Sequence, residues 1–410
     1  MNISDERLLE IYGECNKSKE RFLALEKHFT DNFGLDSYEF FSSPGRTEIV
    51  GNHTDHNGGR VIAGSISMDT IAAAAKNNTR TIEIISEGYD GKIIVDLDND
   101  SFKPEKTDTT ALLYGMVKAI KDKGYNIDGF SAYVSTNVIA AAGVSSSASF
   151  EMLICTIVNY FFNDNKIDFI EYAKIGQYAE NNYWNKASGL MDQLACAVGG
   201  AIKLDFSGEV SYEKVPFDFD GFDYKFILVN SAESHADLSE EYSAVPKEMN
   251  MVARAMGYEK LGETTLENLM ANYENVSRSC GNDRAILRSF HFFEENRRVD
   301  ELSKAMSNND TPEILRIIEA SGNSSWKYLQ NCYVPGISKK EGVAVNLSLS
   351  ELINQKINGV CRIHGGGFCG VILEVVPSEH ADEYIEYMLP KVGAKNIYSM
   401  KIRNTGAVHI

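Results

Sequence analysis

Three consecutive serines, Ser145 to Ser147, are the first residues whose surroundings suggest chemistry. They follow a run of small residues and lead directly into an amphipathic segment that ends at Phe162. This pattern predicts a loop that becomes the N-terminus of a helix, where backbone N–H groups are unpaired. Such amides attract anions, above all phosphates, and the serine hydroxyls can bond phosphate oxygens or ligate Mg²⁺. An ordinary serine-capped helix after a flexible turn is the alternative interpretation.

The densest polar chemistry lies between Pro44 and Met68, where turn residues stand among possible hydrogen-bond donors and acceptors. These candidates are Arg46, Asn52, His53, Asp55 and Asn57. Together they offer what a polyhydroxylated substrate needs, although residues of these types also cap tight turns. The spacing of His53, Asp55 and His56 fits neither a helical pair of ligands nor a known zinc arrangement, which disfavours a transition-metal site.

Two carboxylates, Glu180 and Asp192, are separated by a segment that contains a glycine. By themselves they are interpreted as helix-capping residues.

A glycine-rich stretch near the C-terminus contains Gly365, Gly367 and Gly370 in the spacing GxGxxG. The segment that follows, VILEVV, has the pattern of a strand, whereas a dinucleotide-binding fingerprint requires a helix there. The sequence also contains no GxxxxGK[ST] motif. Both observations disfavour the common nucleotide-binding loops. We interpret the glycines as a turn where backbone meets a ligand or another loop.

The composition limits the class of protein. The chain has 410 residues, which suggests two domains of ordinary size, and its net charge of -18 argues against a nucleic-acid or anionic-membrane partner. Seven scattered cysteines without a CxxC pair suit a reducing compartment and suggest no zinc site. The charged N-terminal residues do not resemble a signal peptide, and no apolar run reaches membrane-spanning length. We therefore expect a cytoplasmic protein.

The periodicity of apolar residues predicts the elements that must position these candidates. We expect one helix over about 5–32, an antiparallel sheet from short strands up to residue 98, and helices at 109–123 and 169–184. The second half is expected to be mainly helical. Its candidate helices are 286–306, 313–330, 342–357 and 380–389, with strands on both sides of the glycine turn and a last strand at 395–402. An acidic loop around 208–223 is the expected domain boundary.

Four motifs occur in order: PGRTEIVGNHTDHNGG, AGVSSSASFE, SGLMDQ and HGGGFCG. Together they resemble the GHMP kinase superfamily, most closely its galactokinase branch, whose signature is usually written GRVNLIGEHTDYNGG. The resemblance covers nearly the whole chain from about Ser43. It implies an α+β, two-domain GHMP kinase fold, with a half like ribosomal protein S5 domain 2 at residues 1–212. A ferredoxin-like half would occupy residues 213–410, and the active site would lie between the halves.

The resemblance also implies an ATP-dependent sugar 1-kinase that uses Mg²⁺, with α-D-galactose as the leading substrate. It identifies Arg46 and Asp192 as catalytic and Ser147 and Glu180 as magnesium ligands. The implied sugar-binding residues are Asn52, His53, Asp55, Gly189 and Tyr242. The implied ATP-binding residues are Ala142, Gly143, Val144, Ser145, Ser146, Ser147, Gly365, Gly366 and Gly367. Whether Asp192 is a true base or only orients the hydroxyl stays open. We expect a monomer or weak homodimer, with sugar and ATP as its ligands.

One departure from the signature concerns the sugar. Asn52 replaces the usual acidic residue, which in this family contacts the sugar near its primary hydroxyl. A galactose relative (galacturonate, N-acetylgalactosamine or arabinose) is therefore an alternative substrate, and Asn52→Glu is expected to favour galactose. A sensor that binds sugar without phosphorylating it is a further alternative, which the intact serine run disfavours.

Overall fold

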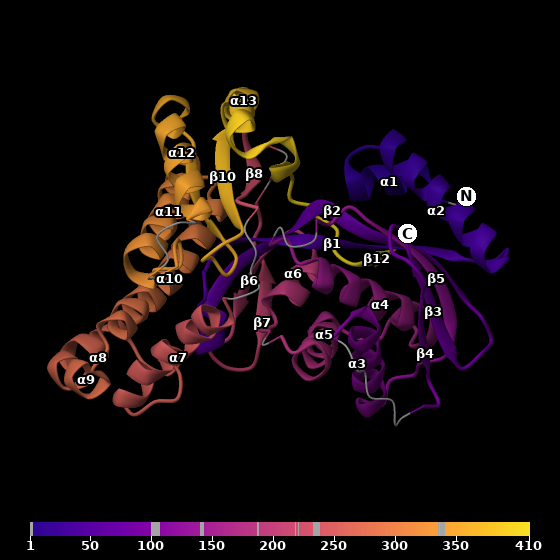
Figure 1. Ribbon diagram of the computed structural model, residues 1–410, viewed down its shortest axis with the longest axis horizontal. Coiled ribbons are helices and arrows are strands. Elements are labelled where there is room, and N and C mark those ends of the chain that lie inside the picture. The colour runs from indigo at the N-terminus through magenta and orange to yellow at the C-terminus, as the bar shows by residue number, and fades with distance from the viewer. Residues whose placement is uncertain are drawn as a thin grey trace.

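The computed structural model describes residues 3–99, 107–139, 143–186, 188–217, 219, 221–232, 238–334, 336 and 341–410. It contains two β-sheets with helices packed on their faces, which confirms the expected α+β architecture (Figure 1). The two sheets correspond to the two halves of the chain except at its end. There the short strand β12 returns to pair with β1 in the first sheet.

The larger sheet has the strand order β12-β1-β2-β5-β3-β4, with β6 and β7 attached through β2. Its strands are β1 (Glu39–Val50), β2 (Arg60–Lys76), β3 (Thr81–Ser86), β4 (Lys92–Asp96), β5 (Phe130–Thr136), β6 (Ala201–Asp205), β7 (Ser211–Lys214) and β12 (Val408–His409). Neighbouring residues of a strand point to opposite faces, so Phe41 and Phe40 enter different cores. On the Phe41 face lie α3 (Thr109–Asp122), α4 (Ser146–Phe162), α5 (Phe169–Tyr183) and α6 (Met191–Val198). On the Phe40 face lie α1 (Asp5–Tyr12) and α2 (Asn16–Phe33).

The smaller sheet is antiparallel, with the strand order β11-β8-β10-β9. Its strands are β8 (Tyr224–Asn230), β9 (Val360–His364), β10 (Val371–Pro377) and β11 (Ile397–Met400). One face packs on α12 (Gly342–Ile357) and α13 (Ala381–Val392). The other face shares a core with the larger sheet, in which Leu228 and Leu373 meet Ile49 and Ile62.

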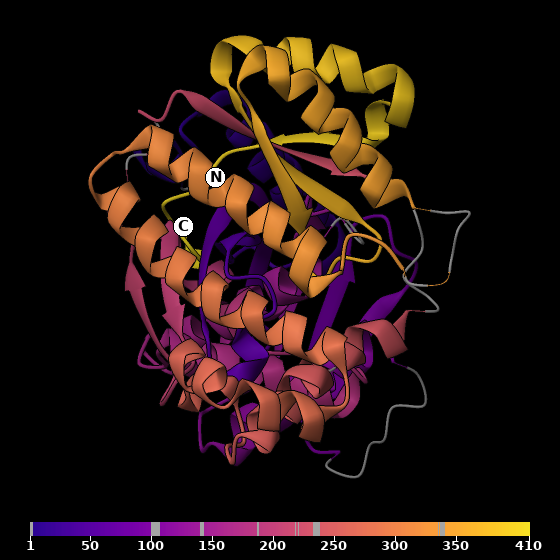
Figure 2. The ribbon, with the colours of Figure 1, turned by 90° about the vertical axis from the view of Figure 1, so that its left-hand side faces the viewer.

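A helical layer connects β8 to β9 and lies across the end of the first sheet (Figure 2). It consists of α7 (Ser239–Ala255), α8 (Leu266–Ala271), α9 (Tyr273–Cys280), the long α10 (Asp283–Ser307) and α11 (Thr311–Ser324). The layer ends in a π-helical turn, η3 (Ser325–Leu329).

Three expectations from the sequence were wrong in detail. The first helix is broken at Gly13, whose backbone is left-handed with φ of 66°, so two helices replace one. Most of the segment from Pro44 to Met68 belongs to the two longest strands rather than to turns. The sheet that contains the strands up to residue 98 is mixed rather than antiparallel, because β5, from beyond that residue, lies between β2 and β3 and pairs in parallel with β3. The division into domains at residue 212 stays a prediction.

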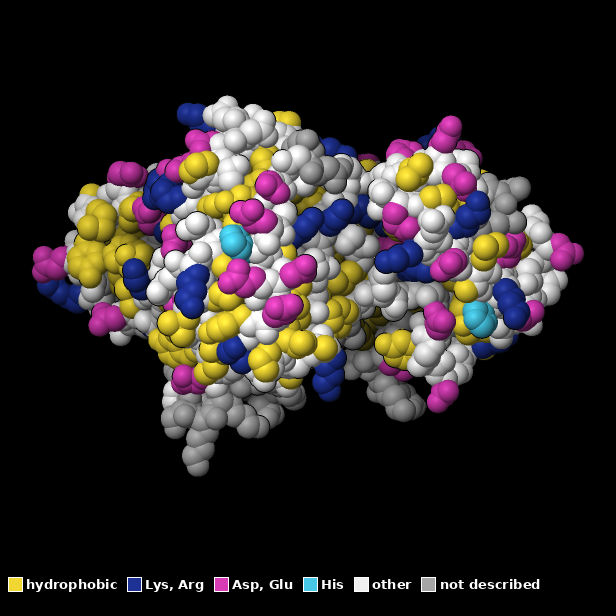
Figure 3. Space-filling model, turned by 90° about the horizontal axis from the view of Figure 1, so that it is seen from above, with side chains coloured by type: hydrophobic (Ala, Val, Ile, Leu, Met, Phe, Trp, Pro, Cys, Tyr) yellow, Lys and Arg dark blue, Asp and Glu magenta, His cyan; other side chains and the backbone are white. Residues whose placement is uncertain are grey.

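The exposed charges are mixed. On the face in Figure 3, basic and acidic side chains lie among one another without a broad region of one sign. Among the described residues, no helix combines the length and apolar character that crossing a membrane requires.

Candidate active site

Arg46 and Asp192 form an ion pair where the larger sheet meets two helix N-termini. The hydrogen-bond register of β1 with β2 shifts between Pro44 and Arg46, an irregularity of the kind that re-aims side chains. Arg46 Nε lies 2.7 Å from Asp192 Oδ1, in the first turn of α6. A second guanidinium nitrogen of Arg46 donates to the carbonyl of Gly143. The pair therefore joins the first sheet to the loop that precedes α4.

Asp192 stays ionised in this position. Burial raises the pKa of its carboxyl group, but the charges of Arg46 and Lys186 and the hydrogen bonds from Arg46 and Ser145 outweigh burial and hold the pKa well below its usual range. Its side chain nevertheless remains 20% exposed, whereas that of Arg46 is 8% exposed. A charged acceptor therefore faces the open side of the site.

Ser145 does not cap the helix that it precedes. Its backbone is left-handed, with φ of 59°, and the helix α4 has no side-chain cap. The hydroxyl of Ser145 instead donates to Asp192 Oδ2 at 2.7 Å. The structure thus favours the anion-binding interpretation over the ordinary capped helix, because the first amides of α4 are left without a side-chain acceptor. Gly143, Val144 and Ser146 lie in the same loop and turn, while Ala142 lies outside the described residues.

Ser147 and Glu180 lie together, as the resemblance implies. The hydroxyl of Ser147 donates to Glu180 Oε1 at 2.7 Å, and the ammonium of Lys186 lies 2.6 Å from the same oxygen and 3.3 Å from Ser147 Oγ. Gln193 donates to both Glu180 and Glu151. One oxygen each of Glu151 and Gln193 is buried without a hydrogen-bond partner in the described part of the chain.

This set of oxygen atoms suits a divalent cation. Hydroxyl and carboxylate oxygens are the ligands that Mg²⁺ prefers, and a positive charge already lies beside them in Lys186. Within the described residues, no three His, Cys, Asp or Glu side chains form a group that could hold a metal ion. Any such ion would therefore depend on additional ligands from its substrate or from water. Lys186 itself was missed, although a lysine between Glu180 and Asp192 was a visible signal.

The residues expected to bind sugar connect segments that are distant in sequence. Gly189 lies so close to Asp55 that an added Cβ would be 2.4 Å from Asp55 Oδ2, so a larger residue there would require the Asp55 side chain to move. Tyr242 of α7 packs on Gly366, and its hydroxyl donates to the carbonyl of Gly367 at 2.9 Å. The glycine turn between β9 and β10 is thus held against α7, and Gly189 is held against residues 52–55, which we call the sugar loop.

His53 links the sugar loop to the glycine turn. Its Nε2 lies 2.9 Å from the carbonyl of Gly366, and its backbone is left-handed with φ of 59°. Burial, assisted by His56, lowers the pKa of His53 to about 4, so the ring is neutral at pH 7. The nitrogen that faces the carbonyl must then carry the proton, which leaves Nδ1 as an acceptor.

The sequence predicted that Asn52 contacts the sugar, but in the structure this residue is only 1% exposed. Its side chain donates to Glu48 and to the carbonyl of Gly365, and it accepts from Asn331. Sequence reasoning missed these partners. Glu48 lies in the same signature, but its partner Arg362 is more than 300 positions away and is brought to it by β9.

Comparison with known proteins agrees with this geometry. The description "Galactokinase galactose-binding signature" matches residues 27–76, and "GHMP kinases N terminal domain" matches residues 111–200. A galactokinase of Clostridium perfringens (strain SM101 / Type A) is 31% identical over 374 residues, which cover 88% of this chain and 92% of that protein. A galactokinase of Limosilactobacillus reuteri (strain DSM 20016) is 30% identical over 380 residues, covering 89% of this chain and 92% of that one.

Solved structures give the same result. The Lactococcus lactis galactokinase complexed with galactose superimposes with a TM-score of 0.82 at 26% identity, covering 95% of this chain and all of that one. A Methanococcus jannaschii mevalonate kinase shares the fold, with a TM-score of 0.63 at 16% identity over 90% of this chain and 99% of that chain. The identity and coverage of these relatives show that the chain belongs to the galactokinase family of GHMP kinases.

Proposed function

We propose that the protein transfers the γ-phosphoryl group of ATP to the anomeric hydroxyl of α-D-galactose, giving α-D-galactose 1-phosphate and ADP. The observation that carries this proposal is the position of Asp192. Its ionised carboxylate is bonded to Arg46 and Ser145, next to the start of α4, and Gly189 of the same segment packs on Asp55 of the sugar loop. The groups that we propose to bind phosphate and sugar therefore meet at one carboxylate.

In the proposed reaction, Asp192 accepts a hydrogen bond from the anomeric hydroxyl and directs its oxygen at the γ-phosphorus. A bond forms between these two atoms while the bond to the β–γ bridging oxygen breaks, and ADP leaves with that electron pair. Because its pKa is depressed, Asp192 takes up the hydroxyl proton only as the new bond forms. Arg46 and the amides at the start of α4 stabilise the negative charge of the phosphoryl group.

We propose Ser147 and Glu180 as the residues that hold Mg²⁺. The ion, when bound, supplies positive charge to the phosphate oxygens. Gly143 to Ser147 and Gly365 to Gly367 would contact the nucleotide, while His53, Asp55, Gly189 and Tyr242 would contact the sugar. The seven cysteines are all free, which supports a reducing cytoplasm as the compartment. A monomer or weak homodimer remains our proposal for the oligomeric state.

The direct test is an ADP-release assay with Mg-ATP and a panel of sugars. The panel contains galactose, 2-deoxygalactose, galactosamine, N-acetylgalactosamine, galacturonate, arabinose and glucose, with a reaction lacking sugar as the background. We expect galactose to give the highest kcat/KM, and the product to carry phosphate at the anomeric carbon by ³¹P NMR.

A different leading sugar would keep the kinase chemistry and reject galactose as the substrate. Release of ADP that no sugar stimulates would reject the kinase altogether. Galactose binding without turnover would instead favour a sugar sensor.

A further inference from the structure

Asn52 is bonded to four different segments of the molecule. Its side-chain amide donates to Glu48 Oε1 at 3.0 Å and to the carbonyl of Gly365 at 2.7 Å, and Oδ1 accepts from Asn331 at 2.8 Å. Its backbone carbonyl lies 2.9 Å from His291 Nε2 of α10. One residue of the sugar loop is thus fixed to β1, the glycine turn, the end of η3 and α10.

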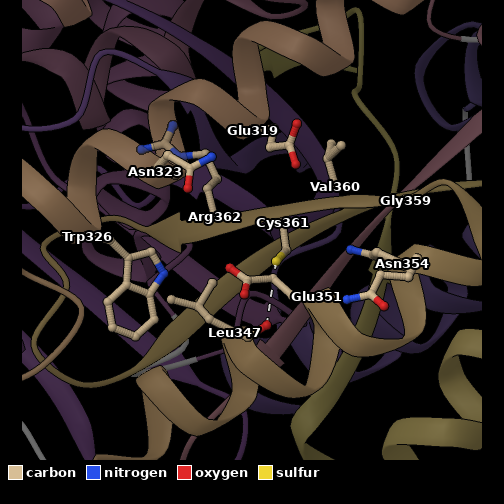
Figure 4. A pocket seen from close by; sticks show the side chains of 12 residues that line it. Glu319, Asn323, Trp326, Leu347, Glu351, Asn354, Gly359, Val360, Cys361 and Arg362 are labelled. Carbon is tan, nitrogen blue, oxygen red and sulfur yellow. Dashed lines mark hydrogen bonds between the residues drawn. The ribbon is translucent and has the colours of Figure 1, made fainter.

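Glu48 is equally enclosed. It is 3% exposed, and its carboxylate accepts from Asn52 and, at 2.8 Å, from Arg362 of β9. Arg362 is fully buried and also donates to the carbonyl of Ile49. It lines a cavity of about 380 Å³ between α11, α12 and β9, which Figure 4 shows from close by. Arg362 therefore lies in the wall between this cavity and the sugar loop.

At positions 48 and 52 the chain carries the residue types of the family signature in exchanged order. The signature GRVNLIGEHTDYNGG has asparagine where this chain has Glu48 and glutamate where it has Asn52. One carboxylate and one amide are thus retained, four residues apart, but in reversed order. Since the two side chains hydrogen-bond to each other, each identity depends on the other: a second carboxylate would be repelled by the first, and it would lack the N–H groups that Gly365 and Glu48 accept.

We propose that Glu48 and Asn52 act as one exchanged acid–amide pair that positions the sugar loop against the glycine turn and sets discrimination at the sugar's primary hydroxyl. The proposal rests on the proposed galactokinase function. With the carboxylate enclosed at position 48, position 52 carries an amide whose N–H groups are already used within the protein. The protein should therefore discriminate weakly between galactose and 6-deoxygalactose. The pair is a positioning unit, and Asn52 alone does not set specificity.

The test is a double-substitution cycle with Glu48→Asn, Asn52→Glu and the combination of both. Asn52→Glu alone should lower kcat/KM for galactose by about 100-fold, because it places two carboxylates together beside one arginine. This differs from the expectation from sequence that Asn52→Glu favours galactose. Glu48→Asn alone should lower it similarly, since it leaves Arg362 buried without its carboxylate.

The combined variant should regain most of the lost activity. It should also raise the ratio of kcat/KM for galactose over that for 6-deoxygalactose by at least about 10-fold, because a carboxylate at position 52 can accept from the primary hydroxyl. A pair that only supports the fold would not change this ratio. If the combined variant is as impaired as the two single effects together, or if the ratio is unchanged, the proposal is overturned.

A control comes from a second amide–acid pair, in which the acid is buried and the amide is half-buried. Asn354 donates to Glu374, which is fully buried, and Asn354 is labelled in Figure 4 far along the cavity from Arg362. Asn354→Glu also places a second carboxyl group beside a buried acid, away from the sugar loop, so it should lower Tm but leave the KM for galactose and the sugar ratio unchanged. Glu48→Gln, a nearly isosteric change, replaces any member of the cycle that fails to fold; it should raise the KM for galactose more than the KM for ATP. An equal rise in both KM values would contradict the proposal. Activity of the unaltered protein on galactose decides the proposed function separately.

Discussion

Two arginine–carboxylate pairs depend on the same strand, β1, and differ in almost everything else. Arg46 reaches Asp192 in the first half of the chain, and Glu48 reaches Arg362 in the second half. Their distances are nearly equal, at 2.7 and 2.8 Å. The carboxylate of the first pair is 20% exposed, whereas that of the second is 4% exposed.

The pKa values of the two carboxylates shift in opposite directions. Burial raises the pKa of Glu48 above its ordinary value despite Arg362 and Asn52, while at Asp192 the opposing charges outweigh burial and the pKa is lowered. An arginine partner alone therefore does not fix the charge of a carboxylate. The Arg46–Asp192 pair, which we call the open pair, keeps a charged acceptor available to substrate. In the Glu48–Arg362 pair, which we call the enclosed pair, the hydrogen-bonding groups are already used within the protein, which suits a positioning role.

The largest expected effect comes from a substitution in the open pair, at Asp192. Asp192→Asn is nearly isosteric, so the fold and galactose binding should persist, but kcat should fall by about 10³-fold because the charged acceptor is lost. Steady-state kinetics and isothermal titration with galactose measure the two quantities. Glu180 and Ser147 remain intact in this variant. Turnover within a few-fold of the unaltered protein would remove Asp192 from the mechanism.

The second prediction replaces each of the two arginines by methionine in separate variants. Arg362→Met leaves Glu48 buried without its cation and should cost about 3–5 kcal/mol of unfolding free energy. Arg46→Met should cost less stability, because Asp192 keeps Ser145 and partial exposure to water, but it should remove most of the turnover. Urea unfolding and ADP release distinguish the two outcomes. Equal loss of stability in both variants would show that the exposure of the carboxylate does not separate their roles.

The sequence predicted the open pair far better than the enclosed one. The resemblance named Arg46, Asp192, Ser147 and Glu180 as site residues, because the first three lie in motifs that stand in order along the chain and Glu180 lies between two of those motifs. Arg362 could not be identified in this way, since its partner Glu48 is distant in sequence and only the packing of β9 against the end of β1 brings them together. Asn52 was expected to contact the sugar. The sequence did not show that its side chain is bonded to Gly365 and Asn331, because both partners are distant from it along the chain. Hydrophobic periodicity predicted most helices, but it did not predict the break at Gly13 or the return of β12 to the first sheet.

The third prediction sharpens the comparison through Lys186, a cation that lowers the pKa of Asp192 in the open pair. Lys186 lies against Glu180 and Ser147, so it competes with a divalent cation for those oxygens. Lys186→Met should therefore tighten the binding of Mn²⁺ in the presence of a non-hydrolysable ATP analogue by about 10-fold, the effect of about one removed unit charge near the surface. Electron paramagnetic resonance of free Mn²⁺ measures it. Lys174→Met, which removes a surface lysine of α5, is the control. Weaker binding would mean that Lys186 assists the metal instead.

The smallest expected effect concerns His53, which lies beside the enclosed pair and bonds the glycine turn. Its pKa is about 4 in the folded protein and about 6.5 in the unfolded chain, so the unfolded chain binds more protons between these values. The stabilising contribution is thus complete above pH 6.5 and is lost as the pH falls towards 4. His53→Gln keeps an N–H for Gly366 but does not titrate. Between pH 7.5 and 4.5 the Tm of His53→Gln should consequently fall by roughly 2–4 °C less than that of the unaltered protein.

His291 and His364 are also buried and have a lowered pKa, so the test is the difference in Tm between the variants rather than the total loss of Tm in each. His380→Gln, at the surface beside α13, should follow the unaltered protein, and parallel curves for His53→Gln as well would show that His53 is not held neutral by its burial.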